Sequence, residues 1–215
     1  MRRWTNEKGT YHCGSGDIAQ AIKRQLETEG YEVYAPSKLE LDVTDWNSIE
    51  NAVAGFIPDV LINNAGYVVP KSIKEADLRN TKKHIDINLS GTFYCTEVAL
   101  KYNPNVDIVN VTSAAAVEKH ATWSEYCATK AAVVMATKCW ADDGLYAVAI
   151  SPARTKTKMR KSLYPGEDQT TLLEPADFAK VISKAVNREY CAGDHILVRK
   201  QTVQDILRGK IDELF

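Results

Sequence analysis

Short apolar runs alternate along the chain with longer stretches in which apolar residues recur every three or four positions. Such runs are typical of buried strands and the longer stretches of amphipathic helices, so the alternation predicts a parallel sheet with helices on both faces. Strands are expected at residues 31–35, 59–63, 106–111, 145–150 and 195–198, after a weaker first strand that ends near His12. Helices are expected around residues 18–26, 49–53, 78–100, 124–141 and 175–185. The pattern therefore predicts a doubly wound α/β fold.

One interval departs from this alternation. The strand at 31–35 is followed almost at once by Leu39-Glu40-Leu41-Asp42, whereas parallel neighbours need a crossover of a dozen or more residues. We therefore expect a shortened second crossover without its helix, in which residues 39–41 form at most a short edge strand. Near the C-terminus, apolar residues from Val203 to Leu214 recur at roughly helical spacing and could pack on the body of the domain or on a second subunit, of which the first is expected.

Composition narrows the possible partners. The 215 residues, 45% of them hydrophobic, suit one globular domain spanning 1–215. A net charge of -1 with scattered charges gives no field for nucleic acid or a membrane, so a small-molecule partner is expected. The short apolar runs predict a cytoplasmic protein. The five cysteines are an odd number without a Cys-x-x-Cys pair, which favours free thiols over disulfides or a metal site.

A glycine-rich turn opens the first predicted helix. The segment Gly14-Ser15-Gly16-Asp17-Ile18-Ala19 fits the dinucleotide pattern G-x-G-x-x-G/A of a Rossmann-like domain. There the free N–H groups of a helix N-terminus hold the pyrophosphate. An ordinary glycine loop is an equally good reading of this segment alone. Asp17 would repel phosphate, so we expect it to cap the helix from outside the anion site.

A tyrosine and a lysine four residues apart share one face of a helix. With ten Tyr in the chain, about 0.8 such pairs are expected by chance, and three occur, starting at Tyr34, Tyr67 and Tyr126. Only Tyr126 is preceded, thirteen residues earlier, by a serine, Ser113, which follows a predicted strand. A free phenol has a pKa near 10, and the neighbouring cation of Lys130 would favour its phenolate. This pair is therefore the candidate for proton transfer.

Five motifs in this order resemble the short-chain dehydrogenase/reductase family. Ser113 and Tyr126-Cys127-Ala128-Thr129-Lys130 match its serine and YxxxK motif, and Asn88 matches the fourth member of its catalytic tetrad. The segment 63–66 reads Asn-Asn-Ala-Gly, Asp42-Val43 resembles the family's adenine-side acidic residue, and 151–157 resembles its PGxxxT motif. The resemblance extends from Gly14 to Thr157 and implies a nicotinamide dinucleotide cofactor.

The resemblance also implies a role for each matching residue. Tyr126 would be the general acid or base and Ser113 would bind the substrate oxygen, while Lys130 would hold the nicotinamide ribose and Asn88 a water that links Lys130 to solvent. Besides Tyr126 and Lys130, the implied cofactor-binding residues are Gly14, Ser15, Gly16, Asp17, Ile18, Ser37, Lys38, Asp42, Val43, Asn64, Ala65, Gly66, Pro152, Ala153, Thr155 and Thr157.

Several positions depart from the family pattern and mark an atypical, short member. The usual G-x-x-x-G-x-G register would put Cys13, Asp17 and Ala19 at glycine positions, whereas Gly16 fits the spacing of the extended branch. Ala153 replaces the usual glycine after Pro152. The predicted second strand ends without a carboxylate at Ser37-Lys38, which favours NADP(H) over NAD(H).

These features predict an NAD(P)(H)-dependent oxidoreductase that interconverts a small carbonyl compound and an alcohol. The altered glycine turn leaves open a catalytically silent dinucleotide sensor or scaffold, and the family also includes epimerases and dehydratases. The substrate pocket is expected from the loops after Ser113 and Thr157 and from the C-terminal segment. His120, Glu125 and the basic residues of 154–161 could contact an anionic substrate, but solvated charge is the favoured reading. Family habit implies a homodimer or homotetramer paired through the helices that carry Asn88 and Tyr126.

Overall fold

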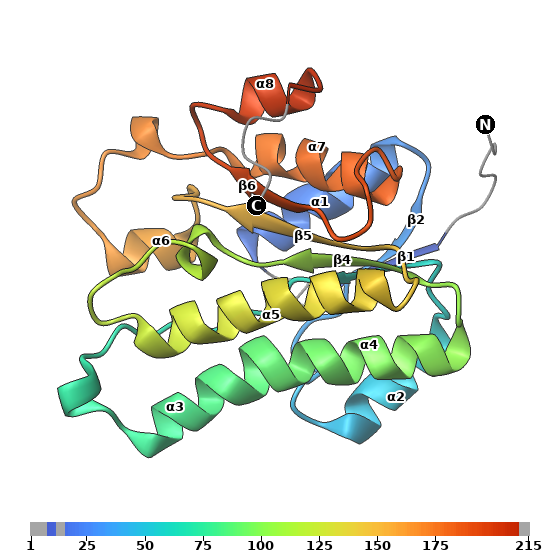
Figure 1. The fold of residues 1–215 in the computed structure, drawn as a ribbon, viewed down its shortest axis with the longest axis horizontal. Helices are drawn as coiled ribbons and strands as arrows, with labels where there is room; N and C mark the ends of the chain where they lie inside the picture. Colours follow the sequence, from blue (N-terminus) through green and yellow to red (C-terminus); the bar gives the residue numbers. More distant parts are fainter. Residues whose placement is uncertain (1–7, 12–15, 211–215) are drawn as a thin grey trace.

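The computed structural model of the chain describes residues 8–11 and 16–210. Within these ranges one parallel sheet contains six strands in the order β2-β1-β3-β4-β5-β6 (Figure 1). The strands are β1 (Lys8–Tyr11), β2 (Glu32–Tyr34), β3 (Val60–Asn63), β4 (Asp107–Val111), β5 (Ala147–Pro152) and β6 (His195–Val198). The order reverses between β1 and β3, where a doubly wound sheet changes the side of its crossovers. The predicted Rossmann-like α/β fold is confirmed.

Helices connect these strands and follow the last one. They are α1 (Asp17–Thr28), α2 (Trp46–Gly55), α3 (Leu78–Ile85), α4 (Gly91–Tyr102), α5 (Ser124–Asp142), α6 (Lys158–Leu163), α7 (Pro175–Val186) and α8 (Val203–Leu207). A π-helical turn, η2 (Asp86–Ser90), joins α3 to α4 in the stretch where one long helix is predicted. Pro175 begins α7, where its missing N–H costs no hydrogen bond.

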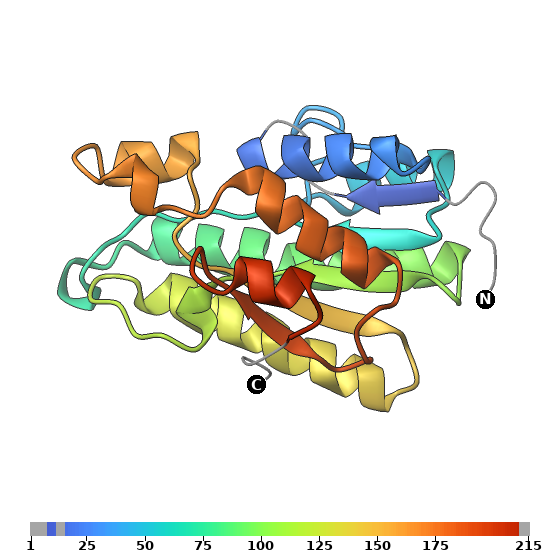
Figure 2. The same ribbon diagram turned by 90° about the horizontal axis from the view of Figure 1, so that it is seen from above.

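The helices form a layer on each face of the sheet (Figure 2). Alternate side chains of a strand point to opposite faces. Accordingly, Ile62 of β3 belongs to the apolar cluster with α1 and α7, whereas its neighbour Leu61 belongs to the cluster with α2 and α4. Because both faces are covered, the described β3, β4, β5 and β6 are buried along their whole length. Residues that could contact a ligand must therefore come from the loops at the strand ends.

No helix lies between β2 and Asp42, as predicted, and α2 is the helix of the crossover from β2 to β3. Instead of a strand at 39–41, the chain makes a turn in which the amides of Glu40 and Leu41 donate to the carbonyl oxygen of Ser37 at 3.0 and 2.9 Å. Leu39 is fully exposed, whereas Leu41 is 3% exposed and packs against α2 and α4. The turn therefore brings the chain across the sheet edge directly to Asp42.

The C-terminal segment packs on the domain, as expected. Val203 and Ile206 of α8 are each 2% exposed and join the cluster under α7, while Ile211 and Leu214 lie outside the described residues. In the described ranges, no helix is long and apolar enough to cross a membrane. The same ranges contain no group of three or more His, Cys, Asp or Glu side chains placed to hold a metal.

Candidate active site

The carboxyl ends of β3, β4 and β5 bring together the residues expected to move a proton. Ser113 follows β4 and caps a short 3-10 helix, η3 (Ala114–Ala116), where its Oγ accepts a hydrogen bond from the Ala115 amide at 3.2 Å. Tyr126 and Lys130 lie one turn apart on α5. The Ser113 hydroxyl is hydrogen-bonded to the Tyr126 hydroxyl. Burial raises the pKa of the Tyr126 phenol, and the Ser113 hydrogen bond partly counteracts this increase.

Lys130 lies below the ring of Tyr126 and is almost fully buried, with 4% of the residue exposed. Its Nζ donates to the carbonyl oxygen of Val111 at 3.1 Å and lies 5.9 Å from the centroid of the Tyr126 ring. A Cβ at Gly66 would lie 3.9 Å from the same Nζ. The ammonium is therefore held between the end of β4 and the loop that carries Asn64, Ala65 and Gly66.

Asn88 fixes that loop against the helix of the catalytic pair. It lies in η2 with none of its surface exposed. Its Oδ1 accepts from the Tyr67 amide at 2.7 Å, and its Nδ2 donates to the Tyr67 carbonyl at 2.9 Å and to Thr129 Oγ1 at 3.3 Å. Thr129 precedes Lys130, so Asn88 links the loop after β3 to α5 through protein contacts. Its role toward a water stays a prediction.

The glycine turn is described from Gly16 onward, and Gly14 and Ser15 lie outside the described residues. Gly16 is the N-cap of α1 and, being a glycine, provides no side-chain cap for the first turn. The expectation that Asp17 caps its own helix is wrong, because its Oδ2 accepts a hydrogen bond from the Lys158 amide at 2.6 Å. Asp17 thus ties the turn to the start of α6, and half-buried Ile18 follows it. The open helix N-terminus fits the pyrophosphate of a dinucleotide.

The segment after β5 also runs past this turn. Thr155 is 5% exposed and donates to the Ala153 carbonyl at 2.9 Å, and Thr157 caps α6 by accepting from the Arg160 amide at 3.1 Å. The segment therefore holds itself in place with the hydroxyls of both threonines. Pro152 and Ala153 line a cavity at this edge together with Ser113.

The residues expected at the adenine end meet beyond β2. Asp42 Oδ1 accepts from the Thr44 amide at 2.9 Å and from its hydroxyl at 2.7 Å, and Lys38 Nζ lies 3.8 Å from Asp42 Oδ2. Burial alone would raise the pKa of Asp42, but the Thr44 hydrogen bonds and Lys38 lower it. The Ser37 amide donates to Glu40 Oε2 at 2.8 Å. Val43 is buried against α4.

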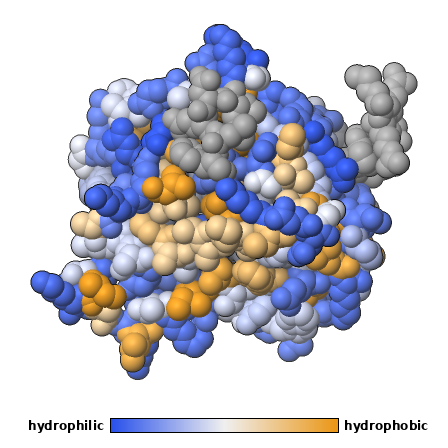
Figure 3. Space-filling view, viewed as in Figure 1, coloured by the Kyte–Doolittle hydropathy of each residue, from blue (hydrophilic) through white to orange (hydrophobic). Residues whose placement is uncertain are grey.

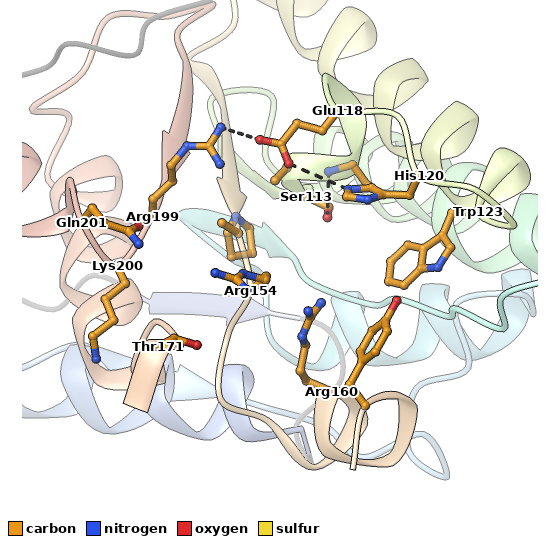
Figure 4. A pocket seen from close by; sticks show the side chains of 15 residues that line it. Ser113, Glu118, His120, Trp123, Arg154, Arg160, Thr171, Arg199, Lys200 and Gln201 are labelled. Atoms are coloured by element: carbon orange, nitrogen blue, oxygen red, sulfur yellow. Dashed lines mark hydrogen bonds and ion pairs between the residues drawn. The ribbon is translucent and has the colours of Figure 1, made fainter. Parts of the chain in front are cut away.

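A cavity of about 400 Å³ opens beside Ser113 (Figure 4). Its walls come from the segments after β4, β5 and β6, which agrees with the pocket predicted from the loops and the C-terminal segment. His120, Arg154 and Arg160 line the cavity. The Arg160 side chain is only 19% exposed, so the prediction that it is a solvated surface charge is wrong. Glu125 points elsewhere, toward Thr81 of α3. The lining residues that sequence reasoning missed are Glu118, Trp123, Tyr164, Thr171, Arg199, Lys200 and Gln201. The position of residues 199–201 directly after the last predicted strand is the signal that could have indicated the final three.

The strand order, the open N-terminus of α1 and the Ser–Tyr–Lys–Asn group define a protein of the dinucleotide-binding α/β class. Comparison with known sequences narrows this class to one family. The model described as short chain dehydrogenase matches residues 12–168. The chain belongs to the short-chain dehydrogenase family.

Curated relatives share about 30% of their residues with the chain. It is 31% identical over 150 residues to a benzil reductase of Bacillus subtilis, an alignment that covers 58% of this chain and 62% of the relative. It is 29% identical over 175 residues to the 3-oxoacyl-[acyl-carrier-protein] reductase FabG of Thermotoga maritima, covering 74% of this chain and 70% of that protein. The chain thus spans somewhat less than two thirds of the length of the first relative and slightly more of the second.

Solved structures share the fold over nearly the whole chain. The aldohexose dehydrogenase of Thermoplasma acidophilum superposes with a TM-score of 0.81 at 23% identity, over 90% of this chain and 92% of that one. The protein ElxO, solved with NADP bound, also has a TM-score of 0.81 at 23% identity, over 94% of this chain and all of that one. These similarities confirm the fold.

Proposed function

We propose that the protein is an oxidoreductase that interconverts a small carbonyl compound and its alcohol, with Tyr126 as the group that donates or accepts the proton. The hydrogen bond between the Tyr126 and Ser113 hydroxyls, beside a cavity and above a buried lysine ammonium, is the observation that carries this proposal. A bound nicotinamide cofactor supplies the hydride chemistry. The protein supplies the proton and the orientation.

The electrostatics suit a proton donor. Because burial raises its pKa, the Tyr126 phenol stays protonated at neutral pH and donates to a carbonyl oxygen during reduction. The resulting negative charge on the phenol oxygen is stabilised by the Lys130 ammonium, which the Val111 carbonyl holds in place. The Ser113 hydroxyl donates to the same substrate oxygen and aligns it with Tyr126.

The proposed cofactor is NADP(H) rather than NAD(H). The N-terminus of α1 would hold the pyrophosphate, and Lys38, whose side chain is 71% exposed, would pair with the 2′-phosphate. The carboxylates of Glu40 and Asp42 on the same turn would repel a 2′-phosphate and so oppose this preference. The ratio of the NADPH and NADH affinities therefore tests the proposal directly. We expect Lys38→Gln to weaken NADPH binding about tenfold and leave NADH binding within twofold, as measured by cofactor fluorescence. Equal affinity of the native protein for both cofactors contradicts the preference.

The activity is tested with a panel of aldehydes and ketones and with both reduced cofactors, following absorbance at 340 nm. We expect turnover by the native protein and a loss of at least about a hundredfold in Tyr126→Phe. Tyr31→Phe, which removes a hydroxyl hydrogen-bonded to Asn187 before the amino-terminal end of β2, is the matched control and keeps its rate. Turnover that Tyr126→Phe retains contradicts the proposed mechanism.

A second candidate is a dinucleotide-binding sensor without turnover. Asp17 favours it, because its carboxylate lies in the turn expected to approach the pyrophosphate and like charges repel. This candidate predicts cofactor binding in calorimetry but no cofactor oxidation with any compound of the panel. Turnover in the panel excludes it.

Self-association through α4 and α5 is a further part of the proposal. A continuous apolar band crosses the face on which α4 and α5 lie (Figure 3). On these helices Tyr94 is 38% and Met135 62% exposed, and a large exposed apolar patch is typical of an interface. Light scattering should give the mass of a dimer or tetramer, which Met135→Lys reduces and Met159→Lys, on α6, leaves unchanged. A monomeric native protein contradicts this part.

A further inference from the structure

The cavity beside Ser113 lies on the substrate side of the proposed active site. The N-terminus of α1 and the Asp42 segment, which would hold the phosphates and adenine, follow β1 and β2 along the chain. The cavity lies at the ends of β4, β5 and β6 instead. Its volume of about 400 Å³ falls within the usual range of small-molecule pockets. The side chains that line the cavity therefore indicate which chemical groups the substrate of the proposed reaction carries.

Positive charge exceeds negative charge around this cavity. Its lining contains the four cations Arg154, Arg160, Arg199 and Lys200 but only one carboxylate, Glu118. Arg160 donates two hydrogen bonds of 2.7 Å to Glu167, and Arg199 pairs with Glu118 at 2.5 Å, so these two charges are compensated within the protein.

Arg154 and Lys200 are compensated less. Arg154 lies 3.5 Å from Glu167, which Arg160 already occupies, and its side chain is 55% exposed. The pKa of the Asp168 carboxyl is lowered mainly by hydrogen bonds from Thr170, and the charge of Lys200 contributes less. Asp168 itself does not line the cavity. Figure 4 shows Arg154 in the middle of the cavity and Lys200 on the wall opposite Trp123. The Lys200 side chain is directed away from Arg154 in the same view, so Arg154 is the cation that an anionic group in the cavity would meet.

The wall next to Tyr126 is aromatic. The Trp123 ring packs edge-on against the Tyr126 ring, with centroids 5.4 Å apart, and lies 6.5 Å from the nearly parallel ring of Tyr164. His120 packs on Trp123 at 5.5 Å. Aromatic side chains bind flat rings by stacking or edge contacts. The cavity thus offers a surface for a ring near the proton donor and cations on its far side.

We propose that the substrate is a ring-bearing carbonyl compound, or its alcohol, that carries an acidic group, and that Arg154 binds this group while Trp123 and Tyr164 bind the ring. This inference rests on the proposed oxidoreductase function. In the reduction, the cofactor's hydride brings two electrons to the carbonyl carbon and Tyr126 gives its proton to the carbonyl oxygen. Solvent then restores the proton of Tyr126.

The test uses three aldehydes with one ring and different charge: 4-formylbenzoate, 4-formylphenyl phosphate and methyl 4-formylbenzoate. We expect kcat/KM with NADPH to be at least tenfold higher for one of the two anions than for the neutral ester, and the better anion distinguishes carboxylate from phosphate. In Arg154→Gln this ratio should fall severalfold toward one. Lys180→Gln removes the same charge from α7, outside the lining, and should keep the ratio of the native protein.

Calorimetry with benzoate, phenyl phosphate and benzamide separates the two proposals, because it needs no turnover. Binding of one anion tighter than benzamide, weakened in Arg154→Gln but not in Lys180→Gln, supports the anion site even if no aldehyde is reduced. Turnover of all three aldehydes at equal kcat/KM leaves the oxidoreductase proposal intact and overturns the anion site. Anions that bind no better than benzamide also overturn it.

Discussion

Gly91 offers a direct test of how closely the adenine-side segment packs on the helix after the π turn. It is the first residue of α4, and a Cβ built on it would lie 2.8 Å from Val43 Cγ2, 2.9 Å from Val43 Cβ and 3.1 Å from the Val43 carbonyl oxygen. Carbon atoms pack best at about 3.5–4.0 Å, and two of the three atoms cannot rotate away. Gly91→Ala must therefore displace either α4 or the segment with Asp42 and Val43.

The size of the effect follows from two opposing contributions. Overpacking typically costs about 1–3 kcal/mol, whereas alanine is favoured over glycine in a helix by about 0.5–1 kcal/mol. We expect a net loss of about 1–2 kcal/mol in the free energy of unfolding, or roughly 2–8 °C in Tm for a chain of this size. Affinity for NADPH should fall as well, because the displaced segment carries Asp42.

The assay is urea unfolding followed by tryptophan fluorescence, together with an NADPH titration. Gly55→Ala is the matched control, since Gly55 ends α2 and a Cβ there meets no atom within 4 Å. It should unfold at the same urea concentration as the native protein or slightly higher. If Gly91→Ala is as stable as Gly55→Ala and binds NADPH equally well, the close packing described here is wrong.

Three further variants test other contacts. Asp17→Asn keeps an acceptor for the Lys158 amide but removes the negative charge beside the proposed phosphate site. NADPH should therefore bind about threefold tighter or more in a fluorescence titration, and weaker binding would contradict the proposed repulsion. Asn88→Ala leaves the part-buried amide and carbonyl of Tyr67 without their side-chain partner and should lower the free energy of unfolding by about 2 kcal/mol in urea, with the exposed Asn105→Ala as a control that stays near the native value. Burial, and secondarily Lys138, lowers the pKa of His195 to about 4. Because the unfolded chain takes up this proton near pH 6.5, the free energy of unfolding should fall by up to about 3 kcal/mol as pH decreases from 6.5 to 4. An unchanged pH dependence in His195→Gln would refute this.

The fold was predictable because its signals are local. Runs of apolar residues mark β3 to β6 within two residues, and the absence of a helix between β2 and Asp42 follows from the short distance between Tyr34 and Asp42 along the chain. The proton-transfer group was also accessible, since the Tyr126–Lys130 spacing and the position of Ser113 after a strand are properties of neighbouring residues. Helical geometry then places them together.

The remaining features depend on contacts between distant segments. Asp17 bonds to an amide 141 positions away, and no local pattern predicts that pairing. The cavity combines residues after three strands, so the direction in which Arg154 and Lys200 point depends on how those loops cross the sheet edge. Thr157 matches a cofactor-binding motif, but its hydroxyl caps α6. A match to a motif therefore predicts where the backbone runs better than it predicts which group the side chain contacts.

The central claim is that Tyr126 transfers the proton that accompanies hydride transfer. A single-turnover experiment with enzyme in excess over NADPH, followed in a stopped-flow instrument, separates this step from cofactor binding and product release. Tyr126→Phe should bind NADPH with a Kd within twofold of the native value and transfer hydride about 10²–10⁴ times more slowly. Hydride transfer at the native rate in Tyr126→Phe, with NADPH bound, would contradict the account.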